Sequence, residues 1–346
     1  MDFYARYFCK SIETDGKEMN SNRASFTAAD AMPIKLLQHD KLIKSIVENK
    51  VIPPLHVQLI PTNKCNLKCS FCSCNNEDRS IEMSKADAVD IAAQLKNMGT
   101  EGVTITGGGE PLLWSHLGEL LKVFHGLNIK TGLVTNGVLL SRKDYSLNYL
   151  TWCRISQGDA REKWNPSFLD RLSSVINSAP DVGWAFSYVV SDNPDFIKIV
   201  KLLKFADDHK FTHVRLVSDL LCTDKIPMKE LKAYVDEFAK GIKVPVIFQD
   251  RKQPEHGDNC RVCYLRPVIT PDMKVYACCG AQYALKNPTL NFPDELCLGH
   301  VSQFKEIILK SSQPFEGAKF CEYCYYGNYN RTLDMLMTNT VHKEFI

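Results

Sequence analysis

The chain has 346 residues, of which 45% are hydrophobic and 24% charged, and its formal net charge at pH 7 is +2. This composition is ordinary for a globular protein, and the length suits one large domain plus a smaller one. Because no long Lys/Arg run is present, a nucleic acid polymer is not expected as a partner. No apolar run reaches the roughly 18 residues of a membrane span, and no secretory signal is recognisable, so we expect a cytoplasmic protein without a membrane partner.

Fourteen cysteines are the unusual feature of the composition, and most of them are bunched. One group lies between Cys65 and Cys74, and the other between Cys260 and Cys324. In a reducing compartment, bunched thiols indicate metal ligation more often than disulfides. Three isolated cysteines are interpreted as small buried hydrophobes: Cys9, Cys153 and Cys222.

Residues 1–50 carry polar stretches and are interpreted as an N-terminal extension with one or two helices. From Leu55 onward, short apolar runs alternate with amphipathic helical stretches, which predicts βα units and a parallel sheet. The predicted strands are 55–60, 102–106, 131–135, 153–156, 183–190 and 213–217. The predicted helices are 84–98, 117–127, 166–176, 194–207 and 228–242.

The helix over 84–98 has Ser84 as its expected N-cap. Four of its residues are expected on one buried face: Val89, Ala92, Ala93 and Leu95. Six βα repeats predict an α/β fold with a partial (β/α)6 TIM-like barrel rather than the closed eightfold one. An open barrel leaves a side for a bulky substrate.

We assign the barrel to residues 51–244 and a small C-terminal domain to residues 245–346. The boundary is expected where Pro245, Pro254 and Gly257 interrupt the helical pattern. Beyond it, residues 266–278 predict a β-hairpin with its turn at 271–274, followed by a helix over 302–311.

The strongest local pattern directly follows the first predicted strand. Cys65, Cys69 and Cys72 form a C-x3-C-x2-C triplet. A [4Fe-4S] cluster normally takes four thiolates, so three from one loop would leave one iron open to a small chelating molecule. Zinc is the alternative, although zinc sites usually pair C-x2-4-C with a second ligand pair. Cys74 is interpreted as a neighbour of the ligands or as a substitute for Cys72.

This triplet, with Phe71 before its third cysteine, resembles the signature of the radical S-adenosylmethionine (radical SAM) superfamily. The resemblance implies that the open iron binds the amino and carboxylate groups of SAM. An electron from the cluster would then cleave SAM to a 5'-deoxyadenosyl radical.

The second predicted strand ends in residues 107–111, Gly-Gly-Gly-Glu-Pro, which resemble the GGEP motif that contacts the amino group of SAM. Glycines let a backbone approach a ligand without a Cβ in the way. The glutamate is expected either to take part in that contact or to brace the loop. The cofactor-binding candidates here are Gly107, Gly108, Gly109 and Glu110.

Three later strands carry further candidate residues, and those of the first two have family counterparts. The resemblance implies a loop-holding role for Asn136, in the Thr-Asn-Gly segment after the third strand. Ser156 is expected to reach the ribose or carboxylate of SAM, and it ranks above Asp159 because residues 157–158 displace that acidic residue by one place. Arg215 on the sixth strand is expected either to pair with the SAM carboxylate or to form a salt bridge inside the barrel mouth.

The C-terminal cysteines, together with the stretch 298–301, resemble the Twitch domain, a shortened SPASM module with one auxiliary [4Fe-4S] cluster. The resemblance implies four ligands: Cys260, Cys278, Cys321 and Cys324. Cys263 and Cys279 are the expected substitutes. Zinc stays the alternative at this site, because two C-x2-C pairs have zinc spacing and thiolates bind both zinc and iron-sulfur clusters.

These resemblances predict a radical SAM enzyme that abstracts hydrogen from a small molecule, leading to bond cleavage or oxidation. Overall similarity indicates the queuine lyase group, which releases a 7-deazaguanine base. A sugar or aminoglycoside dehydrogenase and a peptide-modifying maturase stay open, and reduced flavodoxin or ferredoxin is the implied electron donor. An iron-sulfur electron carrier or sensor is the non-enzyme alternative, but a carrier has no need of the loop at 107–111.

Overall fold

The computed structural model describes residues 35–142, 145–159, 167–219, 221, 227–249, 259–287, 289–324 and 326–338. Most of the predicted N-terminal extension therefore lies outside the described residues, as do Pro254 and Gly257 of the predicted boundary and the isolated Cys9 and Cys222. Within the described ranges, no helix combines the length and the apolar character needed to cross a membrane.

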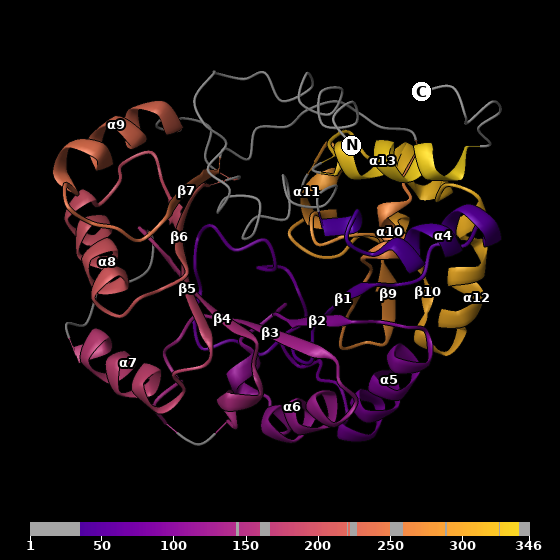
Figure 1. Ribbon diagram of the computed structural model, residues 1–346, viewed down its shortest axis with the longest axis horizontal. Helices are drawn as coiled ribbons and strands as arrows, with labels where there is room; N and C mark the ends of the chain where they lie inside the picture. The colour runs from indigo at the N-terminus through magenta and orange to yellow at the C-terminus, as the bar shows by residue number, and fades with distance from the viewer. Residues whose placement is uncertain are drawn as a thin grey trace.

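The described strands form one ten-stranded sheet in the order β10-β9-β8-β1-β2-β3-β4-β5-β6-β7. Its parallel barrel part is β1 (His56–Leu59), β2 (Gly102–Ile105), β3 (Lys130–Thr135), β4 (Trp152–Gly158), β5 (Gly183–Val190), β6 (His213–Ser218) and β7 (Val246–Gln249). The order ends at β7 and β10, so this sheet curves without closing (Figure 1). The predicted partial barrel is confirmed, but the count of six strands was wrong, because β7 adds a seventh parallel strand beyond the predicted boundary at residue 244.

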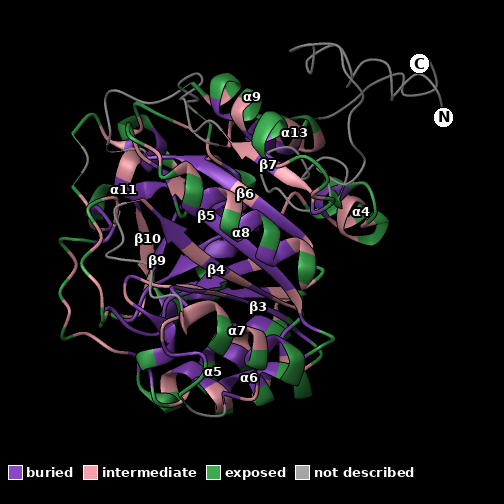
Figure 2. Cartoon of the chain, turned by 90° about the vertical axis from the view of Figure 1, so that its left-hand side faces the viewer, coloured by how far each residue is buried: buried purple, intermediate pink, exposed green. Residues whose placement is uncertain are grey.

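Helices follow most barrel strands and line the outer side of the curved sheet in Figure 1. They are α5 (Lys85–Asn97), α6 (Leu117–Gly126), α7 (Ser167–Ser178), α8 (Phe196–Asp208) and α9 (Met228–Phe238). Short 3-10 turns lie at Pro111–Leu113 and Leu147–Tyr149 in this half. Figure 2 shows buried strands behind helices whose outward faces are exposed.

Helix α5 begins as predicted, since the Ser84 side chain accepts a hydrogen bond from the amide of Asp87. The predicted buried face was partly wrong. Val89 is 39% exposed, and Ala93 is also exposed. The buried side chains are Ala88, Ile91, Ala92 and Leu95, at positions i, i+3, i+4 and i+7, which is the spacing of one helical face.

The two faces of the barrel sheet differ in chemistry. Apolar side chains that alternate along the strands pack under the outer helices and are buried: Val57, Leu59, Val103, Ile105, Leu133, Ile155 and Phe186. Residues paired directly across parallel strands share a face. The register pairs Ser156 with Ser187 and Ser187 with Arg215, so the opposite, inner face carries a row of polar side chains.

The C-terminal segment extends the same sheet. The predicted hairpin is present as β8 (Val268–Ile269) and β9 (Lys274–Tyr276), and β10 (Cys297–His300) pairs with β9. β8 also pairs in parallel with β1, with Gln58 opposite Val268. The helices of this segment are α10 (Val262–Leu265), α11 (Ala281–Ala284), α12 (Phe304–Leu309) and α13 (Gly327–Met337). Helix α4 (Asp40–Asn49), which precedes β1 in the chain, packs against α13. The 3-10 turns are Asp294–Leu296, Val301–Gln303, Lys310–Ser312 and Glu316–Phe320.

Candidate active site

The cysteine loop and the glycine loop lie against each other at the carboxyl ends of β1 and β2. The amide of Gly109 donates to the carbonyl of Thr62 at 3.0 Å, and the amide of Glu110 donates to the carbonyl of Lys64 at 2.7 Å. A Cβ on Gly109 would lie only 2.0 Å from the Lys64 carbonyl oxygen. Glycine at this position therefore serves the close approach of the two loops, whereas the sequence had indicated only the approach of a ligand.

Arg79 joins both loops and was missed by the sequence analysis. One guanidinium nitrogen, Nη1, donates to the carbonyls of Asn63 at 3.1 Å and Gly108 at 3.2 Å. The other, Nη2, donates to the carbonyl of Cys74 at 3.1 Å. Three carbonyls from separate stretches are thus fixed around one cation beside the cysteine triplet.

Glu110 is 2% exposed, and its carboxylate is fully engaged inside the fold. Oε1 accepts from the Thr135 hydroxyl at 2.5 Å and from the Leu112 amide at 3.1 Å. Oε2 accepts from the Asn136 amide at 2.7 Å. In this structure Glu110 braces the ends of β2 and β3, which is the second of the two roles expected from the sequence.

The thiols of the triplet are partly exposed, whereas Cys74 is buried. A hydrogen bond from Cys74 lowers the pKa of Cys72 to about 6, and Arg79 acts in the same direction. Burial raises the pKa of Cys65. Because the thiolate is the ligand form of cysteine, Cys72 is prepared for metal ligation near neutral pH.

Cys74 and Gln282 connect the cysteine loop to the C-terminal segment. The Cys74 thiol lies 3.8 Å from the Gly107 carbonyl oxygen, and Gln282 Nε2 lies 3.6 Å from the Cys74 sulfur. Gln282 comes from α11 and is 3% exposed. Cys74 therefore has the position of a neighbour to the triplet, between the two halves of the molecule.

The remaining predicted cofactor contacts lie at the mouth of the barrel. Asn136 donates from Nδ2 to the side-chain oxygen of Asn66 at 2.8 Å and so holds the cysteine loop. Arg215 donates from Nη2 to the Ser187 hydroxyl at 3.0 Å, on the same row of the inner face as Ser156.

The last residue of β4, Gly158, and the residue after it show why the sequence departs from the family pattern here. A Cβ on Gly158 would lie 2.6 Å from the ring of Phe71, so glycine lets this ring of the cysteine loop pack on the strand end. The carboxylate of Asp159 accepts from the Tyr188 hydroxyl at 2.5 Å and from the Ser191 amide at 2.7 Å. Asp159 therefore stabilises the loop after β5.

The C-terminal segment brings distant cysteines to one cavity, which has about 450 Å³ of empty space, part of it open to solvent. Its lining includes all four cysteines assigned from the sequence: Cys260, Cys278, Cys321 and Cys324. The two substitutes are not among the residues that line this cavity. Cys263 is buried and donates to the Cys260 carbonyl at 3.5 Å, and the exposed Cys279 contacts the Tyr326 hydroxyl at 2.9 Å.

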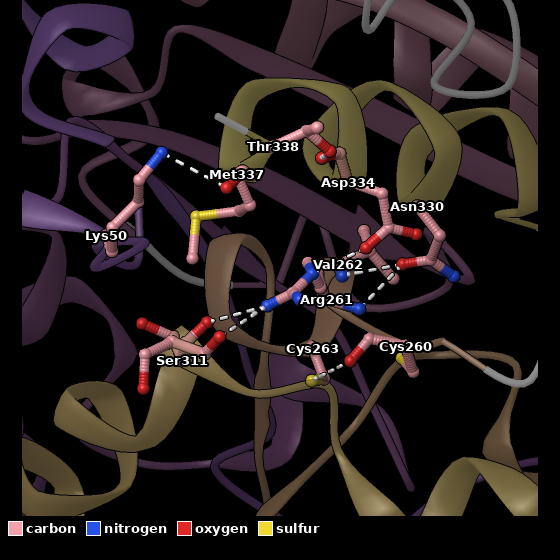
Figure 3. A network of polar contacts seen from close by, with 11 residues as sticks. Lys50, Cys260, Arg261, Val262, Cys263, Ser311, Asn330, Asp334, Met337 and Thr338 are labelled. Atoms are coloured by element: carbon pink, nitrogen blue, oxygen red, sulfur yellow. Dashed lines mark hydrogen bonds and ion pairs between the residues drawn. The ribbon is translucent and has the colours of Figure 1, made fainter. Parts of the chain in front are cut away.

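Asn330 and Arg261 fix two of the cysteine segments to α13 (Figure 3). Asn330 Oδ1 accepts from the amides of Arg261 and Val262, both at 2.8 Å, and its Nδ2 lies 3.8 Å from the Cys324 sulfur. The Arg261 guanidinium pairs with Asp334 at 2.6 Å and donates to the Ser311 carbonyl at 3.0 Å. These two residues were also missed from the sequence.

The donor sets suit iron-sulfur clusters. Thiolates are the ligands of such clusters, and both sites offer only thiols as soft donors. Within the described ranges, no three His, Cys, Asp or Glu side chains converge closely enough to hold a single metal ion.

Comparison with known proteins gives the family. Residues 59–147, from the end of β1 to the turn before β4, match the Radical SAM superfamily. This segment is a radical SAM domain. It contains the cysteine triplet, the glycine loop and Asn136, so the predicted family is confirmed.

The relatives of this chain differ in how much of their length it matches. An S-adenosylmethionine-dependent nucleotide dehydratase from Flammeovirga pacifica is 32% identical over 33% of this chain and 41% of the relative. A protein named "Probable GTP 3',8-cyclase" from Methanothermobacter thermautotrophicus is 24% identical over 65% of this chain and 84% of its own. The chain thus spans less than half of the first relative.

Solved structures support the fold. SuiB of Streptococcus suis, bound to S-adenosylmethionine, superposes with a TM-score of 0.55 at 18% identity, over 94% of this chain and 78% of SuiB. The anSMEcpe protein with bound AdoMet and a peptide superposes with a TM-score of 0.53 at 17% identity, over 84% of this chain and 85% of its own. At these identities the likeness concerns the fold alone.

Proposed function

We propose that this protein is a radical SAM enzyme that acts on a small molecule. In this proposal, Cys65, Cys69 and Cys72 hold a [4Fe-4S] cluster, and SAM binds at its open iron. The observation that carries the proposal is the joining of the cysteine loop to the glycine loop by Arg79 and by backbone hydrogen bonds, within the segment that matches the superfamily.

The bound cluster would supply the electron that cleaves SAM. The protein's own contribution is to hold the loops in register and to shield the site. Glu110 fixes the ends of β2 and β3, and Asn136 holds the cysteine loop through Asn66. Ser156 and Arg215, on the inner face, offer donors to the carboxylate or ribose of SAM or to a polar substrate group.

We further propose an auxiliary [4Fe-4S] cluster at the C-terminal cavity, within a functional module that follows β7 in the chain. Its ligands would be Cys260, Cys278, Cys321 and Cys324, and the support is that all four line one cavity while Cys263 and Cys279 do not. The zinc alternative is tested by metal content: Cys260→Ala is expected to lose iron and sulfide. Loss of zinc with unchanged iron and sulfide would contradict the auxiliary cluster.

For the substrate we propose a small molecule that contains a nucleobase. Two relatives are named for reactions on nucleotides, and the inner face carries Arg154, Ser187 and Arg215 as donors for a polar group. Queuine lyase activity, with release of a 7-deazaguanine base, lies within this class and stays a prediction. A peptide or an aminoglycoside is the competing outcome, and reduced flavodoxin or ferredoxin in the cytoplasm is the proposed electron source.

The test is anaerobic reconstitution with iron and sulfide, followed by incubation with SAM and dithionite. We expect 5'-deoxyadenosine and methionine from the wild type and neither from Cys69→Ala. Nucleotides, queuine, aminoglycosides and peptides would then be screened for a rise in 5'-deoxyadenosine above the uncoupled level. A reconstituted protein that carries iron but yields no 5'-deoxyadenosine would support an electron carrier instead.

A further inference from the structure

One cation lies between the C-terminal cysteine cavity and the first strands of the barrel. Arg266 follows α10, and its Nη1 donates to the hydroxyl of Tyr326 at 3.1 Å. The guanidinium also lies over the Tyr326 ring, 5.6 Å from its centroid. Tyr326 lines the cavity and contacts the sulfur of Cys279, the neighbour of Cys278. The positive charge is therefore one side chain away from the thiols.

On the barrel side, Arg266 is anchored by a neutral group. Its Nε donates to Nδ1 of His56 at 2.9 Å, and Nε2 of His56 lies 2.8 Å from the Thr104 hydroxyl. Because Nδ1 accepts this bond, the ring proton lies on Nε2 and His56 is uncharged. Burial, Arg266 and Lys35 lower the pKa of His56 well below its usual value, which keeps the ring neutral.

On the cavity side, the Arg266 guanidinium contacts Tyr326, whose phenol is uncharged at neutral pH. Among the described residues, no carboxylate forms an ion pair with Arg266. A guanidinium stays protonated in proteins, so this charge is fixed.

We propose that Arg266 raises the reduction potential of the auxiliary cluster by placing a fixed, partly buried positive charge beside it. This inference rests on the auxiliary cluster proposed above. A cluster gains one negative charge when it accepts one electron, and a nearby cation stabilises the reduced form more than the oxidised form. Interactions of this kind are strong where water is excluded and weak where it is not.

The test is a redox titration, followed by electron paramagnetic resonance, of the full chain with Cys65, Cys69 and Cys72 all changed to alanine. Only the auxiliary cluster then contributes to the signal. Arg266→Met is expected to lower the ratio of reduced to oxidised cluster at a fixed potential by about tenfold, which is 59 mV for a one-electron couple. Arg266→Lys keeps the charge and is expected to stay near the reference value.

Lys319→Met is the matched control, because Lys319 is an exposed cation two residues from Cys321. Its charge is screened by solvent, so its removal is expected to change the ratio by less than about twofold. If the Arg266→Met variant does not assemble the cluster, Arg266→Gln is measured in its place. This variant lacks the positive charge but keeps a hydrogen-bond donor for Tyr326, and we expect the same fall in the ratio of reduced to oxidised cluster.

An unchanged potential in Arg266→Met or Arg266→Gln, or an equal shift in Arg266→Lys, would overturn the inference while the auxiliary cluster stands. A triple-alanine protein that holds no iron-sulfur cluster would instead refute the cluster itself. The two failures are thus distinguishable by iron and sulfide content alone.

Discussion

The two cysteine sites are built in opposite ways. The barrel site takes its three thiols from one loop of eight residues, which is held by backbone hydrogen bonds and by the side chains of Arg79 and Asn136. The C-terminal site takes its four thiols from three separate segments, two of which are fixed to α13 by the side chains of Arg261 and Asn330. The first is a local loop at the mouth of a sheet, and the second depends on the tertiary fold around it.

Because of this difference, substitutions at the two sites are expected to affect the reaction and the stability of the fold to different extents. A thiol removed from the loop takes away a ligand but few packing contacts, whereas the supports of the second site are themselves part of the core. We therefore expect changes at the loop to abolish the reaction and leave folding intact. Changes around the C-terminal cavity are expected to weaken both.

The largest effect is expected for Cys69→Ala. This variant should lose 5'-deoxyadenosine formation to the level of protein-free controls, because the cluster loses a ligand. Its iron content should fall by the four irons of one [4Fe-4S] cluster. Its melting temperature in the metal-free state should equal that of the metal-free wild type. A large fall in that melting temperature would contradict the local character of the loop.

Arg261→Ala tests the tertiary character of the second site. Arg261 is 9% exposed, and its loss leaves Asp334 and two carbonyls without their donor. We expect a loss of about 3 kcal/mol in the free energy of unfolding, measured by urea denaturation. Lys232→Ala, at an exposed pair with Asp236, is the control and should change it by less than about 1 kcal/mol. Equal losses of unfolding free energy in Arg261→Ala and Lys232→Ala would contradict the tertiary character of the C-terminal site.

Acid is expected to destabilise the barrel through His213. Burial, reinforced by Arg154 and Arg215, lowers the pKa of His213 from 6.5 to about 3. Between these values the unfolded chain binds one more proton than the native chain, so stability falls as the pH falls. The contribution approaches about 1.4 kcal/mol for each pH unit once the pH is well below 6.5. In His213→Gln the difference in unfolding free energy between pH 5.5 and 4.5 should shrink by about that amount, and an unchanged difference would refute the assignment.

The smallest effect is expected at the N-cap of α5. Ser84→Ala removes the acceptor of the Asp87 amide and should cost about 1 kcal/mol of unfolding free energy. The rate of 5'-deoxyadenosine formation should not change, because Ser84 lies on the outer helix layer. A fall in that rate would show that the outer helices influence the loop directly.

The barrel strands were predictable because each is a short apolar run between turn signals. Strand β7 was missed because Val246–Gln249 follows Pro245 within a stretch that was interpreted as a boundary. The pairing of Gln58 with Val268 could not be predicted, since nothing local specifies a register between segments 210 residues apart. Cysteine spacing identified the candidate ligands, but Arg79, Asn330 and Arg261 are common polar residues whose roles depend on tertiary position.

Mössbauer spectroscopy of the ⁵⁷Fe-reconstituted protein, with and without SAM, tests the central claim most directly. The Cys260→Ala variant would be measured alongside the wild type, to isolate the cluster held by Cys65, Cys69 and Cys72. We predict that SAM changes the isomer shift of one iron in four at that cluster in both proteins. Spectra that are identical with and without SAM would contradict an open iron at the cysteine loop.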